Sequence, residues 1–305
     1  MNESRIQRVV GIDAGGTRTR ARLADAATGR TLGEGTGGPG NALSVPAAAL
    51  VRHLTEALRG ALGPGAGPPA AVVAGFAGGG PGGGREKALA AVEAALAGLG
   101  AGRAVRVDVR GDAEVAFAAG PGTPADGLVL IAGTGAVGAR VRGRRMVSAA
   151  DGDGWLLGDA GSGFWLGREA LRAVLRALDG RGPATALTEP VAALCGGLSK
   201  EHVVRFAYAD RPVRLAELSP LVVGVAAGGD TVAEELLDRA AAELTSTVGA
   251  LEPRPGEPLV VTGGLLGPGG PLLSRLTDRV RPLGLTPAPV PDGLPGAVAL
   301  ARLLA

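Results

Sequence analysis

The stretch that decides the fold runs from Val9 to Asp25 and reads VVGIDAGGTRTRARLAD. A short apolar run ends in a glycine turn, after which polar and apolar residues alternate with period two, as in a half-buried strand. Residues 127–141, GLVLIAGTGAVGARV, repeat this order of strand, glycine turn and strand. A repeated unit of this kind in a chain of 305 residues predicts an α/β protein built from two similar lobes.

The segments between and after the two repeats predict the remaining layers. We expect a third strand near residues 29–35 and buried strands within residues 70–79, 104–112 and 257–267. Apolar residues at helical spacing predict helices over residues 45–62, 85–99, 163–178 and 230–251, with Ser44 as N-cap of the first. The N-terminal lobe is expected to span residues 1–113 and the C-terminal lobe residues 114–305, with the last helix, 295–304, packing back on the first lobe.

Composition excludes several classes of function. Hydrophobic residues make up 46% of the chain and charged residues 20%, which is typical of a globular protein with a full core. The formal net charge is only +2 and like charges do not cluster, so we expect no binding to nucleic acid. The N-terminal residues lack an apolar segment of signal-peptide type, and no apolar run could span a bilayer. We therefore expect a cytoplasmic protein without membrane contact.

The two glycine turns, DAGGT and AGTGA, are candidate phosphate sites. Without a Cβ, backbone N–H groups in such a turn can approach phosphate oxygens closely. Neither turn is a dinucleotide fingerprint or a Walker A loop, because each precedes a strand and lacks the Gly-Lys-Ser/Thr sequence. One such turn alone is more simply a tight hairpin. Two in equivalent positions, and a third at Gly263 and Gly264, favour nucleotide binding, with Thr17 and Thr134 contacting the phosphates.

Three carboxylates beside glycines or strand ends are candidates for chemistry. Asp13 either forms the turn or holds Mg²⁺ through water, since Mg²⁺ prefers oxygen ligands and keeps several waters. Asp112 follows a strand and precedes an apolar helix, so it is either a helix N-cap or a general base that accepts the proton of a sugar hydroxyl. Asp159 either interacts favourably with the dipole of the helix that follows it or accepts hydrogen bonds from two sugar hydroxyls. Of the neighbouring aromatic residues, we expect only Trp155 to contact a sugar.

Six segments together resemble a known family. GIDAGGTRTRARLAD, GPGN, RGDAEVAFAAG, LIAGTGAVGAR, GDGWLLGDAGSGFWLGREAL and VVTGGLLG are similar, in order and spacing, to the motifs of the N-acetylglucosamine kinase branch of the actin-like sugar kinases. That branch belongs to the wider group of BadF/BadG/BcrA/BcrD-type ATPases. The resemblance covers nearly the whole chain, and LLGDAGSGFWLGREAL is its most characteristic part.

The resemblance implies two ribonuclease H-like lobes of the actin-like ATPase type, with the active site in the cleft between them. It implies ATP and Mg²⁺ as cofactors, an amino sugar as substrate and a homodimer as the assembly. The residue roles that it implies are Asp112 as catalytic base; Asn41, Gly135 and Asp159 around the sugar; Gly15, Gly16, Thr17, Thr134, Gly228, Gly263 and Gly264 around the nucleotide; and Asp13 at the metal. From the residues themselves we add Trp155 and Asp153 to the expected sugar site.

One position departs from the family pattern. The family usually reads Gly-Gly-Trp-Gly before the Leu-Leu-Gly-Asp element, whereas this chain reads DGDG and has Asp153 in place of the tryptophan. A carboxylate there would favour a free amine, so glucosamine stands beside N-acetylglucosamine as the expected substrate, with phosphorylation at O6.

Two other functions are weighed against a sugar kinase. An activator ATPase that carries an iron–sulfur cluster would need two thiolates from each subunit, whereas Cys195 is the only cysteine. A sugar-sensing regulator of the same fold would need an attached DNA-binding helix pair. Only about eight residues precede the first strand, which we expect to be too few for such a pair.

Overall fold

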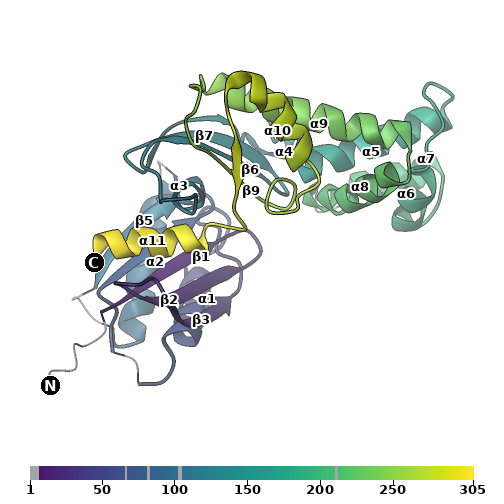
Figure 1. Cartoon of the computed structure of the whole chain (residues 1–305). Coiled ribbons are helices and arrows are strands. Elements are labelled where there is room, and N and C mark those ends of the chain that lie inside the picture. Colours follow the sequence, from purple (N-terminus) through teal and green to yellow (C-terminus); the bar gives the residue numbers. More distant parts are fainter. Residues whose placement is uncertain (1–6, 66, 81–82, 102–104, 210–211) are drawn as a thin grey trace, which may run out of the picture. The chain divides into compact units, whose positions relative to one another are not determined.

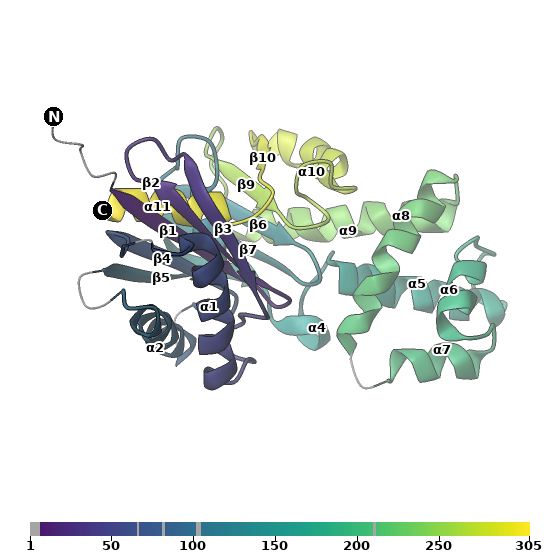
Figure 2. The ribbon, with the colours of Figure 1, turned by 90° about the horizontal axis from the view of Figure 1, so that it is seen from below.

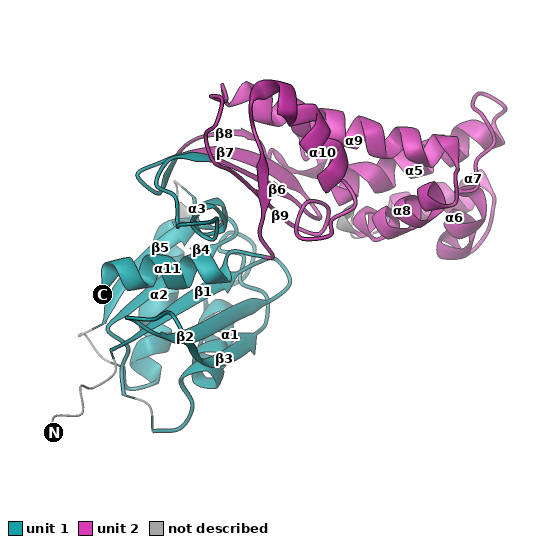
Figure 3. Ribbon diagram, viewed as in Figure 1, with its two compact units in different colours: residues 1–127, 141–146, 292–305 teal, residues 128–140, 147–291 magenta. Residues whose placement is uncertain are grey.

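The computed structural model describes residues 7–65, 67–80, 83–101, 105–209 and 212–305. The chain forms two compact units, which Figure 3 shows in different colours. Unit 1 comprises residues 1–127, 141–146 and 292–305, and unit 2 comprises residues 128–140 and 147–291. Helix α3 and the last helix pack within unit 1, so the chain passes between the units after residues 127, 140, 146 and 291.

Unit 1 is a five-stranded mixed sheet of order β3-β2-β1-β4-β5 (Figure 1). Strands β1 and β2 are antiparallel, and β1, β4 and β5 are parallel. Its elements are β1 (Arg8–Ala14), β2 (Thr19–Asp25), β3 (Thr31–Gly37), α1 (Ala47–Leu62), β4 (Ala71–Phe76), α2 (Gly83–Gly98), β5 (Arg106–Gly111), α3 (Asp112–Ala118) and α11 (Leu294–Leu304).

Helices cover both faces of this sheet. Successive residues of β1 alternate between two apolar clusters, since Val10 packs with residues of α1 and α2 while Val9 packs with residues of α3 and α11. Figure 2 shows α1 and α2 on one side of the strands. Helix α1 begins after Pro46 and has no side-chain cap, so the expected N-cap at Ser44 is wrong. Proline suits a first helical turn because its missing N–H would have no partner there.

Unit 2 contains a second five-stranded sheet, of order β10-β9-β6-β7-β8, and most of the helices. Its elements are β6 (Gly127–Ala132), β7 (Ala136–Arg142), β8 (Arg145–Asp151), α4 (Gly154–Leu157), α5 (Gly163–Leu178), α6 (Thr188–Cys195), α7 (Lys200–Ala207), the 3-10 helix η1 (Pro212–Leu218), α8 (Ser219–Ala227), α9 (Thr231–Ala250), β9 (Leu259–Thr262), α10 (Leu273–Val280), the 3-10 helix η2 (Arg281–Leu283) and β10 (Pro287–Pro289). The apolar core joins β6 and β9 to α5, α8, α9 and α10.

The two sheets have the same topology. If β6, β7, β8, β9 and β10 are matched in turn to β1, β2, β3, β4 and β5, the strand orders coincide, and β6, β9 and β10 are parallel as β1, β4 and β5 are. The expected repeat is therefore real, and each glycine turn connects the first two strands of its sheet. Strands β8 and β10 were not expected. Among the described residues, no helix is long and apolar enough to cross a bilayer.

Candidate functional site

Asp13 and Asp112 lie at the carboxyl edge of the sheet in unit 1. The parallel register pairs Asp13 with Gly75 of β4, and Gly75 in turn with Arg110 of β5. Asp112 follows the last residue of β5. Carboxyl ends of parallel strands are where α/β folds gather their ligands. A Cβ at Gly75 would lie 2.2 Å from Val115 Cγ2, so glycine there lets α3 pack close to the sheet.

Arg20 holds Asp13 in place. It lies opposite Asp13 on β2, and its guanidinium donates to Asp13 Oδ2 at 2.7 Å and to Asp292 Oδ2 at 2.6 Å. Burial raises the pKa of the Asp13 carboxyl, and the nearby Arg20 partly offsets this effect. Asp292 precedes α11 and accepts the N–H of Leu294. The same guanidinium therefore joins the first glycine turn to the start of the last helix.

The first glycine turn is open to solvent beside this ion pair. Gly15 N–H donates to Arg18 O at 3.0 Å, which closes the turn. A Cβ on Gly16 would meet no atom of the described chain within 4 Å, so internal packing does not account for glycine at that position. Thr17 is exposed. The geometry suits an approaching oxyanion, because backbone N–H groups in glycine turns can bind one closely.

Asn41 lies next to this turn. Gly40 N–H donates to Gly15 O at 2.8 Å, and Ala42 N–H donates to Ala77 O at 2.9 Å, at the end of β4. The side-chain oxygen of Asn41 accepts the N–H groups of Leu43 and Ser44 at 2.9 and 3.0 Å. This Asx turn occupies the oxygen, so the side-chain NH₂ can donate to a ligand hydroxyl.

Asp112 is the first residue of α3 and not its N-cap. The N-cap is Gly111, whose N–H donates to the buried Glu114 carboxylate at 2.9 Å. The other Glu114 oxygen accepts the N–H of Met146 at 3.0 Å. Asp112 Oδ1 accepts the N–H of Ala113 at 2.9 Å, and burial raises the pKa of Asp112 to about 6. The N-cap interpretation is therefore wrong. Sequence reasoning missed Glu114, although Glu three residues after a candidate cap is a typical signal.

The donor set in unit 1 fits Mg²⁺ held through water. Among the described residues, no group of three or more His, Cys, Asp or Glu side chains could hold a metal directly. Mg²⁺ keeps several of its waters and is commonly bound by one or two carboxylates together with substrate phosphates. Asp13 could supply such a carboxylate beside the first glycine turn.

The second glycine turn, in unit 2, is tied to Asp159. Gly133 N–H donates to Gly135 O at 2.9 Å and closes the turn. Asp159 Oδ1 accepts the N–H of Ala136 at 3.0 Å. A Cβ on Gly135 would lie 2.7 Å from the same oxygen. Glycine at this position therefore allows the acid to approach the turn, so the structure brings Thr134, Gly135 and Asp159 together.

Asp151, which the sequence did not indicate as a site residue, positions Asp159. Its two carboxylate oxygens accept the N–H groups of Asp159 and Ala160 at 2.6 and 2.8 Å. Asp159 has a φ of +55°, a left-handed conformation that is rare outside glycine. Burial raises the pKa of Asp159, the Ala136 N–H lowers it, and the Asp151 and Asp153 charges raise it. Strain at a polar residue of this kind is typical of functional sites.

Asp153 precedes the short helix α4, and Trp155 is the second residue of that helix. Asp153 is exposed and is the residue before that helix, but its side chain makes no capping hydrogen bond. Trp155 is 42% exposed, and its ring lies 5.7 Å from the ring of Phe164, which is buried. Phe164 and Trp165 belong to the core, as expected. Trp155 therefore keeps an accessible face, which is what a sugar contact requires.

A cavity of about 600 Å³ adjoins the second glycine turn. Its lining includes Thr134, Gly264 and residues of α8. Gly263 does not line it, but a Cβ there would lie 2.2 Å from Ala132 O, so glycine is required beside β6. Gly228 is the C-cap of α8, whereas the cavity touches the N-terminal half of that helix. The lining residues of α8 that the sequence did not indicate are Ser219, Pro220 and Val223.

Comparison with known proteins identifies the family. The profile described as the BadF/BadG/BcrA/BcrD ATPase family matches residues 10–283. The chain belongs to this family. It is 31% identical over 188 residues to an N-acetyl-D-glucosamine kinase of Dictyostelium discoideum, a match that spans 59% of each protein. It is 30% identical over 249 residues to an N-acetylmuramic acid/N-acetylglucosamine kinase of Clostridium acetobutylicum, covering 80% of this chain and 78% of that enzyme.

A solved structure supports the same placement. A protein of Chromobacterium violaceum, provisionally named an N-acetylglucosamine kinase, has a TM-score of 0.74 and 28% identity, over 97% of this chain and 99% of that chain. The family and the two-lobed α/β fold expected from the sequence are thus confirmed. The family is one of ATPases, so ATP is the expected nucleotide, and the cavity beside Thr134 and Gly264 is the candidate site for its nucleoside.

Proposed function

We propose that this protein is an ATP-dependent kinase that phosphorylates an amino sugar. The observation that carries the proposal is Asp112, a carboxylate whose pKa burial raises to about 6, at the same sheet edge as a glycine turn and Asn41. The names of the two enzymes from Dictyostelium and Clostridium support an amino sugar as the acceptor.

In the proposed reaction, Asp112 accepts the proton of the attacking sugar hydroxyl while the hydroxyl oxygen forms its bond to the γ-phosphorus. The bond from that phosphorus to the β,γ-bridging oxygen breaks, and ADP leaves. A raised pKa makes Asp112 a stronger base than an exposed aspartate, yet leaves it ionised at neutral pH. The two glycine turns would donate N–H groups to the phosphates, and Mg²⁺ beside Asp13 would neutralise charge on the transferring group.

Sugar binding is assigned to Asn41 and Asp159, aided by Trp155. The Asn41 NH₂ donates to a hydroxyl, and the second oxygen of Asp159 accepts one, since the first is engaged by Ala136. Trp155 would cover an apolar face of the ring. The remaining polar group is the exposed Asp153, which offers a carboxylate where a protonated amine could bind. We propose glucosamine as the preferred substrate over its N-acetyl derivative, with transfer to the primary O6 hydroxyl in a homodimeric enzyme.

A coupled ADP-release assay with ATP and Mg²⁺ tests the proposal. Glucosamine, N-acetylglucosamine, N-acetylmannosamine, N-acetylmuramic acid and glucose are compared for the wild type, Asp112→Asn and Asp153→Trp. We expect turnover on an amino sugar that Asp112→Asn loses, and a change in the kcat/KM ratio of glucosamine to N-acetylglucosamine with Asp153→Trp. Product analysis by NMR locates the phosphate, and analytical ultracentrifugation gives the assembly. Sugar binding by calorimetry without turnover would instead favour a sugar-sensing regulator.

A further inference from the structure

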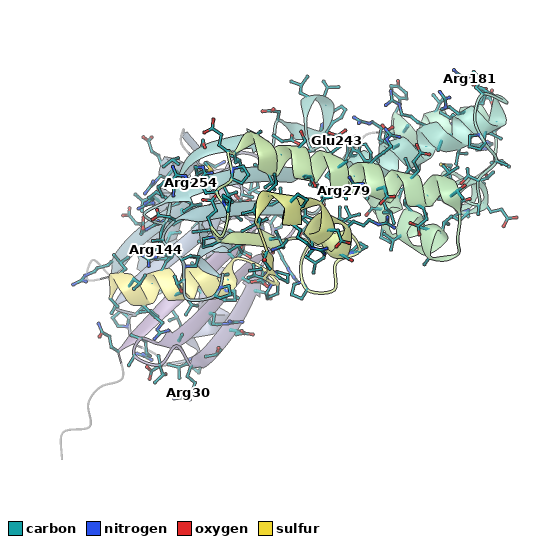
Figure 4. All side chains as sticks on the ribbon, turned by 45° about the horizontal axis from the view of Figure 1, so that its top comes forward. Arg30, Arg144, Arg181, Glu243, Arg254 and Arg279 are labelled. Carbon is teal, nitrogen blue, oxygen red and sulfur yellow. The ribbon has the colours of Figure 1, made fainter. Side chains whose placement is uncertain are left out.

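A second cavity, of about 660 Å³, lies between α5 and α9 in unit 2 and has several charged side chains in its lining. Its lining includes Arg172 and Arg176 from α5, Arg181 from the turn after α5, and Arg239 from α9. It shares no lining residue with the cavity beside the second glycine turn. Its volume is within the range of small-molecule sites. Figure 4 labels Arg181, at the end of the helical part of unit 2.

A buried glutamate orders two of these arginines. Glu169 is 7% exposed, and its carboxylate accepts from Arg172 at 2.9 Å and from Arg239 at 3.3 Å. The Arg239 guanidinium also lies 5.2 Å from the centre of the Trp165 ring. Although burial favours the protonated acid, the Arg172 and Arg168 guanidiniums hold the pKa of Glu169 below its usual value. Glu169 thus stays charged and fixes arginines from two helices before any ligand arrives.

Most of the donors of these arginines remain free for a ligand. The Arg172 side chain is 65% exposed and that of Arg239 is 50% exposed, and each gives only one N–H group to Glu169. A guanidinium carries five N–H donors in a rigid fork that matches phosphate and carboxylate groups. Ordering of the fork in advance reduces the entropy lost when a ligand binds.

The cavity carries excess positive charge. Four arginines line it against two glutamates, Glu169 and Glu235, which leaves a formal excess of two positive charges. Arg176 donates to the carbonyl of Arg181 at 2.9 Å, and Arg181 pairs with Asp179 outside the lining. A phosphate monoester carries a charge of about −1.5 to −2 at neutral pH, which would balance this excess.

We propose that the cavity between α5 and α9 is a binding site for a small phosphorylated molecule, separate from the proposed nucleotide site. The phosphate lies among Arg172, Arg176 and Arg239, and the rest of the ligand fills the cavity toward Arg181. This proposal does not rest on the kinase activity, since it concerns binding alone.

Trp165 provides a direct readout, because a ligand on Arg239 changes the surroundings of the ring. A Trp155→Phe background leaves Trp165 as the only tryptophan. Fluorescence is titrated with inorganic phosphate, with glucosamine 6-phosphate and with malonate, at constant ionic strength and with saturating ADP and Mg²⁺ to occupy the other site. Calorimetry under the same conditions gives the stoichiometry. The variants are Arg172→Gln and Arg176→Gln, and the matched control is Arg279→Gln, an exposed arginine on α10 outside the cavity (Figure 4).

We expect saturable binding of one phosphate compound per chain, weakened about tenfold or more by either cavity variant and unchanged by Arg279→Gln. Tighter binding of glucosamine 6-phosphate than of inorganic phosphate identifies a sugar phosphate as the ligand, and equal binding identifies the phosphate group alone. Arg176→Gln removes only a contact to a backbone carbonyl, so its loss of binding is not a folding effect. Absence of saturable binding in the wild type, equal affinity in all variants, or preference for malonate would overturn the proposal.

Discussion

Replacement of Asp112 by asparagine should abolish turnover and stabilise the protein at the same time. Burial raises the pKa of Asp112 from 3.8 to about 6. Since one pKa unit corresponds to about 1.4 kcal/mol, the charged form is disfavoured in the folded protein by up to about 3 kcal/mol. Asparagine has nearly the same shape, and its side-chain oxygen can still accept the N–H of Ala113. The substitution therefore removes the charge and leaves the start of α3 intact.

The sign of the pH dependence follows from the raised pKa. The folded protein holds the Asp112 proton to a higher pH than the unfolded chain, so this group lowers stability as pH rises from about 4 to about 6. Above pH 6 the full penalty is present. Asp112→Asn should accordingly exceed the wild type in free energy of unfolding by up to about 3 kcal/mol at pH 8, and the difference should shrink toward zero near pH 4.

Urea denaturation at several pH values, paired with the ADP-release assay, tests this reasoning. We expect wild-type kcat to rise tenfold per pH unit up to about pH 6 and then level off, as Asp112 loses its proton. Asp112→Asn should lower kcat by about 10²–10⁴-fold. A variant that is less stable than the wild type at pH 8, or one that retains turnover, would refute the assignment of Asp112 as a buried base.

Three further substitutions test the groups that position the site. Arg20→Gln leaves Asp13 without its cation, and we expect a loss of about 1–2 kcal/mol in urea denaturation, largely restored by Arg20→Lys. Gly135→Ala places a methyl group against the Asp159 carboxylate, so KM for the sugar should rise with a stability loss of about 1–3 kcal/mol; unchanged kinetics would contradict that contact. Asp151→Asn keeps one acceptor oxygen for three N–H groups, so the melting temperature should fall and the sugar KM rise, whereas a fall in kcat alone would argue against a positioning role.

Local sequence patterns predicted the strands and glycine turns of both repeats, but not every strand of the two sheets. The strand, glycine turn and strand units could be identified twice because alternation of apolar residues and loss of Cβ are visible in a short window. Strand β8 could not be identified in this way, since three of its residues are exposed and its apolar pattern is weak. Strand β10 has two prolines in three residues and lies at the edge of its sheet. Proline lacks the N–H group of a sheet ladder, so such a segment is tolerated at an edge but does not look like a strand in the sequence.

Motifs indicated most of the candidate site residues, whereas contacts between residues that are distant in the sequence were missed. Asp13 and Asp112 lie at one sheet edge because parallel strands end together, and the backbone on either side of Asn41 bonds to residues at that edge. Nothing local indicates that Arg20 reaches Asp292, which is 272 residues away in the chain. The sequence assigned Gly228 to the nucleotide, but the cavity touches the opposite end of α8. The position of a cavity along a helix depends on how the helix packs, which a local pattern does not show.

The two sheets carry the same glycine turn beside different acidic side chains. Each unit keeps a glycine turn between its first two strands, so each retains backbone N–H groups suited to phosphate.

The side chains beside the turns differ. In unit 1 a cation holds the acid, since Arg20 donates to Asp13. In unit 2 backbone N–H groups hold the acids, since among the described residues Asp151 and Asp159 accept hydrogen bonds from main-chain donors only. An acid paired with arginine is largely neutralised, whereas Asp159, whose Oδ1 accepts a neutral amide, keeps its second oxygen for a hydroxyl or an amine. This difference supports the proposal that unit 2 recognises the sugar and that unit 1, with Asp112, activates it.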